Sequence, residues 1–97
     1  MFDLIPDSPE PTGRARSPVT VYGTRWCAAT QSVRRLLDRY GISYEYRDIE
    51  ADPAAERQVR WWTGGYASHP TIQVGGDILV EPSTNELRWA LSRNGLA

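Results

Sequence analysis

Hydrophobic and polar positions alternate in two short stretches of the chain, with the two-residue period of a β-strand. The first stretch runs from Pro18 to Tyr22, and the second is ISYEYRDI, residues 42–49. Both are rich in β-branched or aromatic residues, which favours strands over helices. We therefore predict a strand in each stretch, and we expect Gly23 to end the first one.

Apolar residues recur at helical spacing in the segments that follow these two strands. The segment CAATQSVRRLLDRYG, residues 27–41, predicts a helix that stops at its final glycine. A second helix is predicted after the second strand, because Asp52 is a favourable N-cap residue and Pro53 is favoured in a first turn. Gly64 and Gly65 are expected to end that helix.

The last third of the chain predicts a hairpin followed by a helix. In TIQVGGDILV, residues 71–80, two short apolar runs flank a glycine pair, which is typical of a tight hairpin turn. STNE, residues 83–86, has the form of a capping box, in which serine and glutamate satisfy free backbone groups at a helix start. We predict that the last helix begins after Ser83 and ends at Gly95.

The predicted order is strand, helix, strand, helix, hairpin and helix, or βαβαββα. A βαβ unit requires parallel strands with a right-handed crossover, and a hairpin adds antiparallel strands. The prediction is an α/β domain, residues 18–97, in which three helices cover a four-stranded mixed sheet. Residues 1–17 contain three prolines and few apolar residues, so we expect a flexible N-terminal tail. The alternative is an arm that packs on the domain through Phe2, Leu4 and Ile5.

Composition and charge argue against several classes of function. The formal net charge is -1, which gives no reason to expect a nucleic-acid or membrane partner. No apolar run approaches the ~20 residues of a membrane span, and the N-terminus lacks the apolar region of a signal peptide. We therefore expect a cytoplasmic protein, and a monomer. One cysteine and one histidine argue against an internal disulfide and against a Cys/His metal site, so we expect no metal.

The single cysteine, Cys27, lies in TRWCAAT, residues 24–30, where the first strand gives way to the first helix. A helix N-terminus carries unpaired backbone N–H groups and about half a positive charge, and both favour a thiolate. Arg25 would add positive charge, and Trp26 would form a flat wall beside the thiol. These features predict a reactive nucleophile. The alternatives are a small buried apolar role for Cys27 and packing against the domain edge for Trp26.

His69 and Pro70 precede the third predicted strand and follow a glycine-containing loop. A proline gives no N–H to a strand ladder, so it belongs at the start or edge of a strand. A cis bond between these two residues would turn the backbone of His69 towards the helix N-terminus that holds Cys27. On frequency alone a trans bond is favoured, and only the context of the fold can favour cis. In the cis form, His69 would contribute its backbone, rather than its side chain, to ligand binding.

With these elements in place, the sequence resembles the glutaredoxins, which are small proteins of the thioredoxin fold. The resemblance covers roughly Val19 to Leu91 and is carried by VTVYGTRWC, GISYEYRDIEADPAAERQV, HPTIQVGG and EPSTNEL. The tryptophan before the cysteine, the DIEADPAA stretch and EPS before the last helix are most similar to the mycoredoxins. Mycoredoxins are the glutaredoxin relatives that use the small thiol mycothiol.

The resemblance implies a nucleophilic thiolate at Cys27, a cis proline at Pro70 and a backbone bridge from His69 to a bound small thiol. We add Trp61 and Ser83 to the candidate thiol-binding residues. The implied activity is thiol–disulfide exchange on mixed disulfides between proteins and a low-molecular-weight thiol. We expect no tightly bound cofactor, and the partners implied are mycothiol or glutathione and thiolated proteins.

The sequence departs from the glutaredoxin pattern at three places. Dithiol members have cysteine where Thr30 stands, so Cys27 would work through a cycle that uses one sulfur. The Thr30 hydroxyl would either donate to the thiolate or bond to the local backbone. The residue before the cis proline is usually aliphatic, and here it is His69. VEPS, residues 80–83, replaces the usual glycine pair, and Glu81 would repel a carboxylate of glutathione, whereas mycothiol has none.

Two other functions remain open from the sequence. A thioredoxin-fold module without catalysis would bind a partner through exposed aromatic residues, drawn from Trp26, Trp61, Trp62 and Tyr66. Of these, we expect Trp62 to belong to the core and Trp61 to be exposed. An iron–sulfur carrier is the second alternative, but its motif has a glycine and a bulky aromatic residue after the cysteine, and CAAT has neither.

Overall fold

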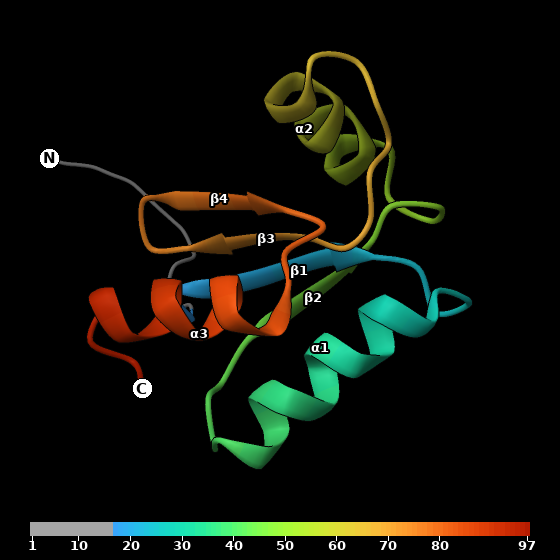
Figure 1. The fold of residues 1–97 in the computed structure, drawn as a ribbon. Coiled ribbons are helices and arrows are strands. Elements are labelled where there is room, and N and C mark those ends of the chain that lie inside the picture. The colour runs from blue at the N-terminus through green and yellow to red at the C-terminus, as the bar shows by residue number, and fades with distance from the viewer. Residues whose placement is uncertain (1–16) are drawn as a thin grey trace, which may run out of the picture.

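The fold is that of a computed structural model, and the residues described from it are 17–97. The predicted tail, except for Ser17, lies outside the described residues, and so does the alternative arm. The elements follow the predicted order, as Figure 1 shows. They are β1 (Val19–Gly23), α1 (Ala28–Arg39), β2 (Glu45–Asp48), α2 (Pro53–Thr63), β3 (Thr71–Val74), β4 (Asp77–Val80) and α3 (Thr84–Arg93).

The strands form one mixed sheet in the order β2-β1-β3-β4. β1 is parallel to β2, with Val21 opposite Tyr46, and antiparallel to β3, with Val21 opposite Ile72. β3 and β4 form the predicted antiparallel hairpin. This arrangement confirms the predicted α/β class with a four-stranded mixed sheet and three helices. It also places the end of β1, which leads into α1, in the centre of the sheet.

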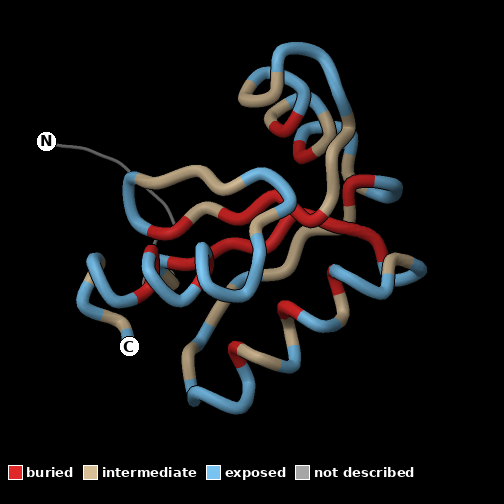
Figure 2. The backbone as a smooth tube through the Cα atoms, in the orientation of Figure 1, coloured by how far each residue is buried: buried red, intermediate tan, exposed pale blue. Residues whose placement is uncertain are grey.

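The helices cover both faces of the sheet. α1 and α3 pack on one face and α2 on the other (Figure 1). Because successive side chains of a strand point to opposite faces, β1 contributes to both cores. Val19 and Val21 pack with residues of α1 and α3, whereas Tyr22 packs with Ala55 and Val59 of α2. The buried residues in Figure 2 accordingly concentrate on β1, β3 and the inner sides of the helices.

The second strand is shorter than predicted. We expected residues 42–49, but β2 runs only over Glu45–Asp48. Its pairing with β1 begins at Glu45, opposite Thr20. The preceding residues still close the end of α1, because Gly41 adopts a left-handed φ of 68° and the Ile42 N–H donates to the Leu37 carbonyl at 2.9 Å. The alternation in sequence therefore extends further than the paired strand.

The helix boundaries agree closely with the capping signals. The Asp52 side chain accepts from the N–H groups at the start of α2, and Gly64 ends that helix with a left-handed φ of 82°. At α3, Ser83 and Glu86 form both hydrogen bonds of the predicted capping box. The C-cap of α3 is Asn94, followed by the predicted glycine with φ 75°. No helix within residues 17–97 is long and apolar enough to cross a membrane.

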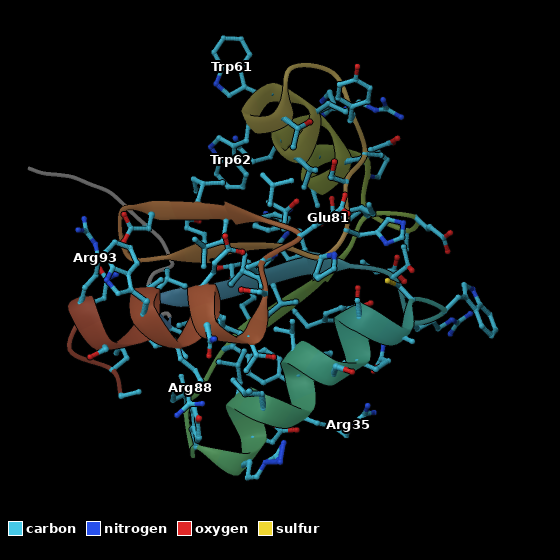
Figure 3. The ribbon with its side chains drawn as sticks, viewed as in Figure 1. Arg35, Trp61, Trp62, Glu81, Arg88 and Arg93 are labelled. Carbon is cyan, nitrogen blue, oxygen red and sulfur yellow. The ribbon has the colours of Figure 1, made fainter. Side chains whose placement is uncertain are left out.

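The two adjacent tryptophans of α2 have different environments, as predicted. Trp62 packs at the edge of the second core, where its ring meets Tyr22 edge-to-face with a centroid distance of 5.3 Å. Trp61 is 81% exposed. Figure 3 shows Trp61 on the outer side of α2, pointing away from the sheet.

Candidate functional site

Cys27 lies at the turn between β1 and α1, where it is the N-cap residue of the helix. Its backbone is extended, its N–H donates to the Thr24 carbonyl at 3.3 Å, and its carbonyl accepts from Gln31 at 3.1 Å. The residue is only partly buried. The thiol is therefore held at the free N–H groups of the first turn of α1 and remains accessible from solvent.

The loop before β3 brings a second backbone segment to the cysteine. The His69–Pro70 bond is cis, as predicted. The Cys27 thiol faces the carbonyl oxygen of His69, with a Sγ–O distance of 4.0 Å. Residues far apart in the sequence thus meet at the end of the sheet where β1 turns into α1.

Thr30 lies one turn into α1 and is fully buried. Its Oγ1 has no hydrogen-bond partner among the described residues, so the alternative in which it bonds to the local backbone is not found. The side chain packs directly against Gly23, the last residue of β1. A Cβ atom on Gly23 would lie 2.5 Å from both Oγ1 and Cγ2 of Thr30. The strand end and the helix start are therefore in close contact beneath the thiol.

The surroundings of Cys27 favour the thiolate. Partial burial by itself raises the pKa of the thiol. Hydrogen bonds to the sulfur from the side chain and backbone N–H of Thr30, from the His69 side chain and from the Ala29 backbone N–H outweigh it, and the pKa falls from 9.0 to about 7. In the structure itself, neither Thr30 Oγ1 nor His69 Nδ1 makes a hydrogen bond of regular geometry.

Arg25 and Trp26 lie in the loop immediately before the cysteine. Trp26 is 76% exposed, so it is not packed against the edge of the domain. The guanidinium of Arg25 lies over the Trp26 ring, 5.1 Å from its centroid. Hydrogen bonds, rather than the charge of Arg25, therefore account for the lowered pKa of Cys27.

Ser83 lies on one side of the site, whereas Trp61 does not join it. Ser83 borders a cavity of about 290 Å³ between the first turns of α1 and α3, with Ala29 on the opposite wall. Ser83 takes part in the capping box, in which its Oγ accepts from the Glu86 N–H at 3.1 Å and its N–H donates to Glu86 Oε1 at 2.7 Å. Trp61 points into solvent from the outer side of α2 (Figure 3).

A second cavity, of about 340 Å³, is lined in part by His69 and is acidic. Thr24 at the end of β1, Glu50 in the loop after β2 and Glu56 on α2 all line it. Arg60 forms an ion pair with Glu56 at 3.0 Å. We did not anticipate this cavity, because its residues come from four separate segments and share no local sequence signal.

Glu81 follows β4 and adopts an unusual backbone conformation. Its φ is 49°, in the left-handed region that non-glycine residues rarely occupy. Its N–H donates to the Pro70 carbonyl at 2.8 Å, which ties it to the cis-proline loop. Figure 3 labels Glu81 where the chain leaves β4 for α3. From the sequence we expected its charge to repel a carboxylate of glutathione, but no signal in the sequence indicated this strain.

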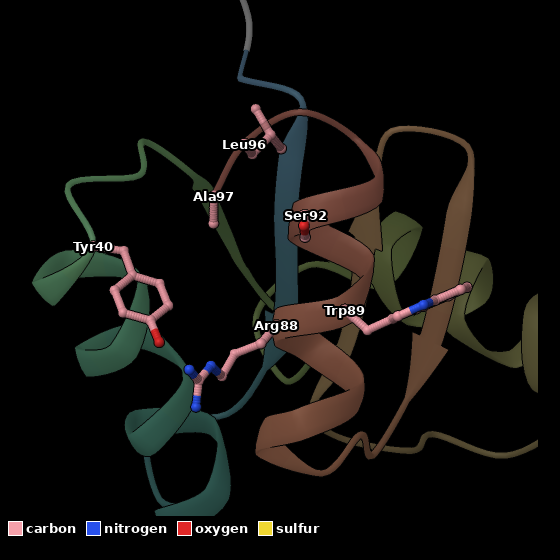
Figure 4. Close-up of a pocket in the computed structure, with 6 residues that line it drawn as sticks. All are labelled: Tyr40, Arg88, Trp89, Ser92, Leu96 and Ala97. Atoms are coloured by element: carbon pink, nitrogen blue, oxygen red, sulfur yellow. The ribbon is translucent and has the colours of Figure 1, made fainter.

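A further cavity, of about 620 Å³, lies far from the cysteine (Figure 4). It is lined by Tyr40, Arg88, Trp89, Ser92, Leu96 and Ala97. Tyr40 caps the C-terminus of α1, whereas Cys27 caps the N-terminus of the same 12-residue helix, so about 18 Å of helix separates them. This cavity therefore takes no part in the chemistry of Cys27. Among residues 17–97, no group of three or more His, Cys, Asp or Glu side chains is placed to hold a metal ion.

The comparisons with known proteins agree with this geometry. The glutaredoxin family model matches residues 19–79, a segment that contains Cys27, His69 and Pro70. A search of curated proteins finds no match.

Solved structures with the same fold include proteins of the thioredoxin and glutaredoxin type. The thioredoxin-like protein BC3987 is 25% identical, with a TM-score of 0.68 over 75% of this chain and 99% of its own. The glutaredoxin from Archaeoglobus fulgidus is 18% identical, with a TM-score of 0.70 over 79% of this chain and 88% of its own. A buckwheat glutaredoxin in complex with glutathione is 20% identical, with a TM-score of 0.63 over 82% of this chain and 81% of its own. The chain therefore has the predicted thioredoxin-like fold.

Proposed function

Because this chain belongs to the glutaredoxin family, we propose that it is a thiol–disulfide oxidoreductase in which Cys27 acts through a one-cysteine cycle. The observation that carries the proposal is the position of the thiol. Cys27 caps α1, faces the carbonyl of the residue before a cis proline and has a pKa of about 7. A thiolate that is abundant at neutral pH and accessible is what disulfide exchange requires.

The proposed cycle has two exchange steps. In the first, the Cys27 thiolate attacks the small-thiol sulfur of a protein mixed disulfide, forms a disulfide with that small thiol and releases the protein thiolate. In the second, a second molecule of the small thiol attacks this disulfide and restores the Cys27 thiolate. The net result is release of the protein cysteine as a thiol, while one free small thiol joins the small thiol of the mixed disulfide to form their disulfide. No second cysteine in the chain is needed.

Thr30 supports the one-cysteine cycle rather than a two-cysteine one. It occupies the position, one turn along α1, from which a second thiol would resolve the intermediate. Its buried hydroxyl is one of the groups that lower the pKa of Cys27. In the proposed cycle it stabilises the thiolate both as nucleophile and as leaving group.

The charges around the site favour a small thiol without carboxylates, and we propose mycothiol as the co-substrate. Glutathione carries two carboxylates. Glu50 lines the cavity beside His69, and Glu81 is tied by its backbone to Pro70, so both lie near a thiol bound at Cys27. The Ser83 N–H at the start of α3 already donates to the Glu86 carboxylate, so it is not free to receive a carboxylate of glutathione. Carboxylates at these two places would repel the carboxylates of glutathione and weaken its binding, whereas they would not affect the binding of a neutral thiol.

The proposal is tested by offering the reduced protein mycothiol disulfide and glutathione disulfide in separate reactions and measuring its intact mass. We expect one mycothiol adduct per chain and less glutathione adduct at equal concentration. Cys27→Ser is the matched control and should form neither. The same two thiols are then compared as co-substrates with a peptide mixed disulfide. Absence of both adducts would show that Cys27 is not the nucleophile. Preference for glutathione would overturn only the assignment of mycothiol as the small thiol and would leave the proposed activity standing.

A further inference from the structure

His69 is the single histidine of the chain, and the proposed cycle gives its side chain no role. Its backbone is fixed by the cis bond to Pro70, and its carbonyl faces the thiol at 4.0 Å. Its imidazole Nδ1 is buried, with no hydrogen-bond partner among the described residues. A buried polar atom without a partner is costly, so its retention beside a reactive sulfur suggests a use.

Thr30 provides a second group of the same kind near the sulfur. Its Oγ1 is also buried without a partner, and it comes from α1 rather than from the cis-proline loop. Three buried side-chain atoms in residues 17–97 lack a partner, and two of the three belong to the immediate neighbours of Cys27. A negative charge on sulfur is the acceptor that both positions share.

We propose that the His69 imidazole is a catalytic group that donates an N–H hydrogen bond to the Cys27 sulfur whenever that sulfur carries negative charge. The inference rests on the proposed function and reverses our expectation from the sequence, which assigned only the backbone of His69 to the site. In the first exchange step the hydrogen bond stabilises the thiolate before attack. In the second step the S–S bond to Cys27 breaks, its electron pair returns to the Cys27 sulfur, and the same N–H receives that charge. The imidazole keeps its proton throughout.

The charged groups around the imidazole are known from the cavity that it lines. Glu50 and Glu56 share that cavity with His69, and Arg60 pairs with Glu56. On the other side lies the thiol itself, while the guanidinium of Arg25 lies over Trp26. The groups that approach His69 are therefore the carboxylates of this cavity and the thiol of Cys27.

The test compares His69→Val, which removes the donor, with His69→Asn, which keeps an amide N–H near the position of Nδ1. The thiolate is followed by its ultraviolet absorbance against pH, and its reactivity by iodoacetamide alkylation against pH. For His69→Val we expect the midpoint to rise from about 7 by roughly one unit. Alkylation at pH 7 should then fall about two-fold and its plateau at high pH rise about three-fold, because a more basic thiolate is more nucleophilic. For His69→Asn we expect less than half of that shift.

Turnover with a small-thiol mixed disulfide completes the test. It should fall more than alkylation in His69→Val, because Cys27 is also the leaving group in the second step. An unchanged midpoint in His69→Val, or equal shifts in both variants, would overturn the proposal. If neither variant folds by circular dichroism, the His69 ring resonances of the wild type decide. They must show a step at the midpoint of the Cys27 thiolate absorbance, and this step must be absent in Cys27→Ser. The titrations need no disulfide substrate, so they separate this inference from the proposed oxidoreductase activity.

Discussion

At the scale of single residues, Glu81 combines backbone strain with charge near the site. Its φ of 49° costs a non-glycine residue about 1 kcal/mol or more. The conformation persists because the Glu81 N–H bonds to the Pro70 carbonyl and α3 begins shortly afterwards at Thr84. The residue therefore keeps a carboxylate beside the cis-proline loop at some expense of stability.

Replacing Glu81 with glycine should stabilise the protein by about 0.5–1 kcal/mol, because glycine adopts a left-handed φ without a steric penalty. Urea unfolding at pH 7 measures the change. Glu81→Gln is the matched control, since it removes the charge but keeps the Cβ atom, and its stability should stay near that of the wild type. Both variants should accept glutathione disulfide better than the wild type does. A stabilised Gln variant would show that charge repulsion, not φ, is the source of the strain.

The residues that sequence reasoning missed share one property, which is that their role depends on distant contacts. Cys27 was recognised because its chemistry follows from its own position at a helix start. The His69 imidazole and the cavity lined by Glu50 and Glu56 depend on segments brought together by the fold. No local pattern encodes such contacts, so they become visible only in three dimensions.

At the scale of elements, local capping signals predicted helices more accurately than alternation predicted strands. Asp52 and the box of Ser83 and Glu86 fix α2 and α3 through hydrogen bonds made within a few residues. A strand, in contrast, extends only as far as its neighbour pairs with it. β2 therefore begins at Glu45, opposite Thr20, although the alternation in sequence begins at Ile42.

The junction of β1 and α1 is the element contact on which the site depends most. Gly23→Ala should destabilise the protein by about 1–3 kcal/mol, because the new Cβ atom would lie 2.5 Å from two atoms of the fully buried Thr30. The clash should also displace the Thr30 hydroxyl and raise the pKa of Cys27. Urea unfolding and thiolate absorbance measure the two effects.

Thr30→Ala supplies the control for this contact. In a double-mutant cycle, Gly23→Ala should cost clearly less when Thr30 has already been shortened to alanine, because the two contacts at 2.5 Å are then removed and only the Cβ contact at 3.1 Å remains. Additive costs would mean that the strand and helix adjust independently. The close packing at Gly23 would then not be what positions the first turn of α1.

At the scale of the whole molecule, different titrating groups change the free energy of unfolding in different pH ranges. The pKa values of Asp52 and Asp77 are lowered by hydrogen bonds, from Arg47 and Asn94 respectively, so their contribution is lost as pH falls through the acid range. Burial raises the pKa values of Tyr22 and Tyr46 above 10.0, so stability falls at high pH, where the unfolded chain ionises first. The range between them is where Cys27 ionises.

The free energy of unfolding of the wild type should therefore rise between pH 7 and pH 9 relative to that of Cys27→Ser. The pKa of Cys27 is about 7 in the folded protein and 9.0 without the fold, so between these values the unfolded state binds a proton that the folded state has released. The contribution is fully present above pH 9 and disappears as pH falls through 7. The comparison is made by urea unfolding at several pH values under reducing conditions. The aspartates and tyrosines cancel because both proteins carry them, and parallel curves for the two proteins would mean that the fold does not stabilise the thiolate.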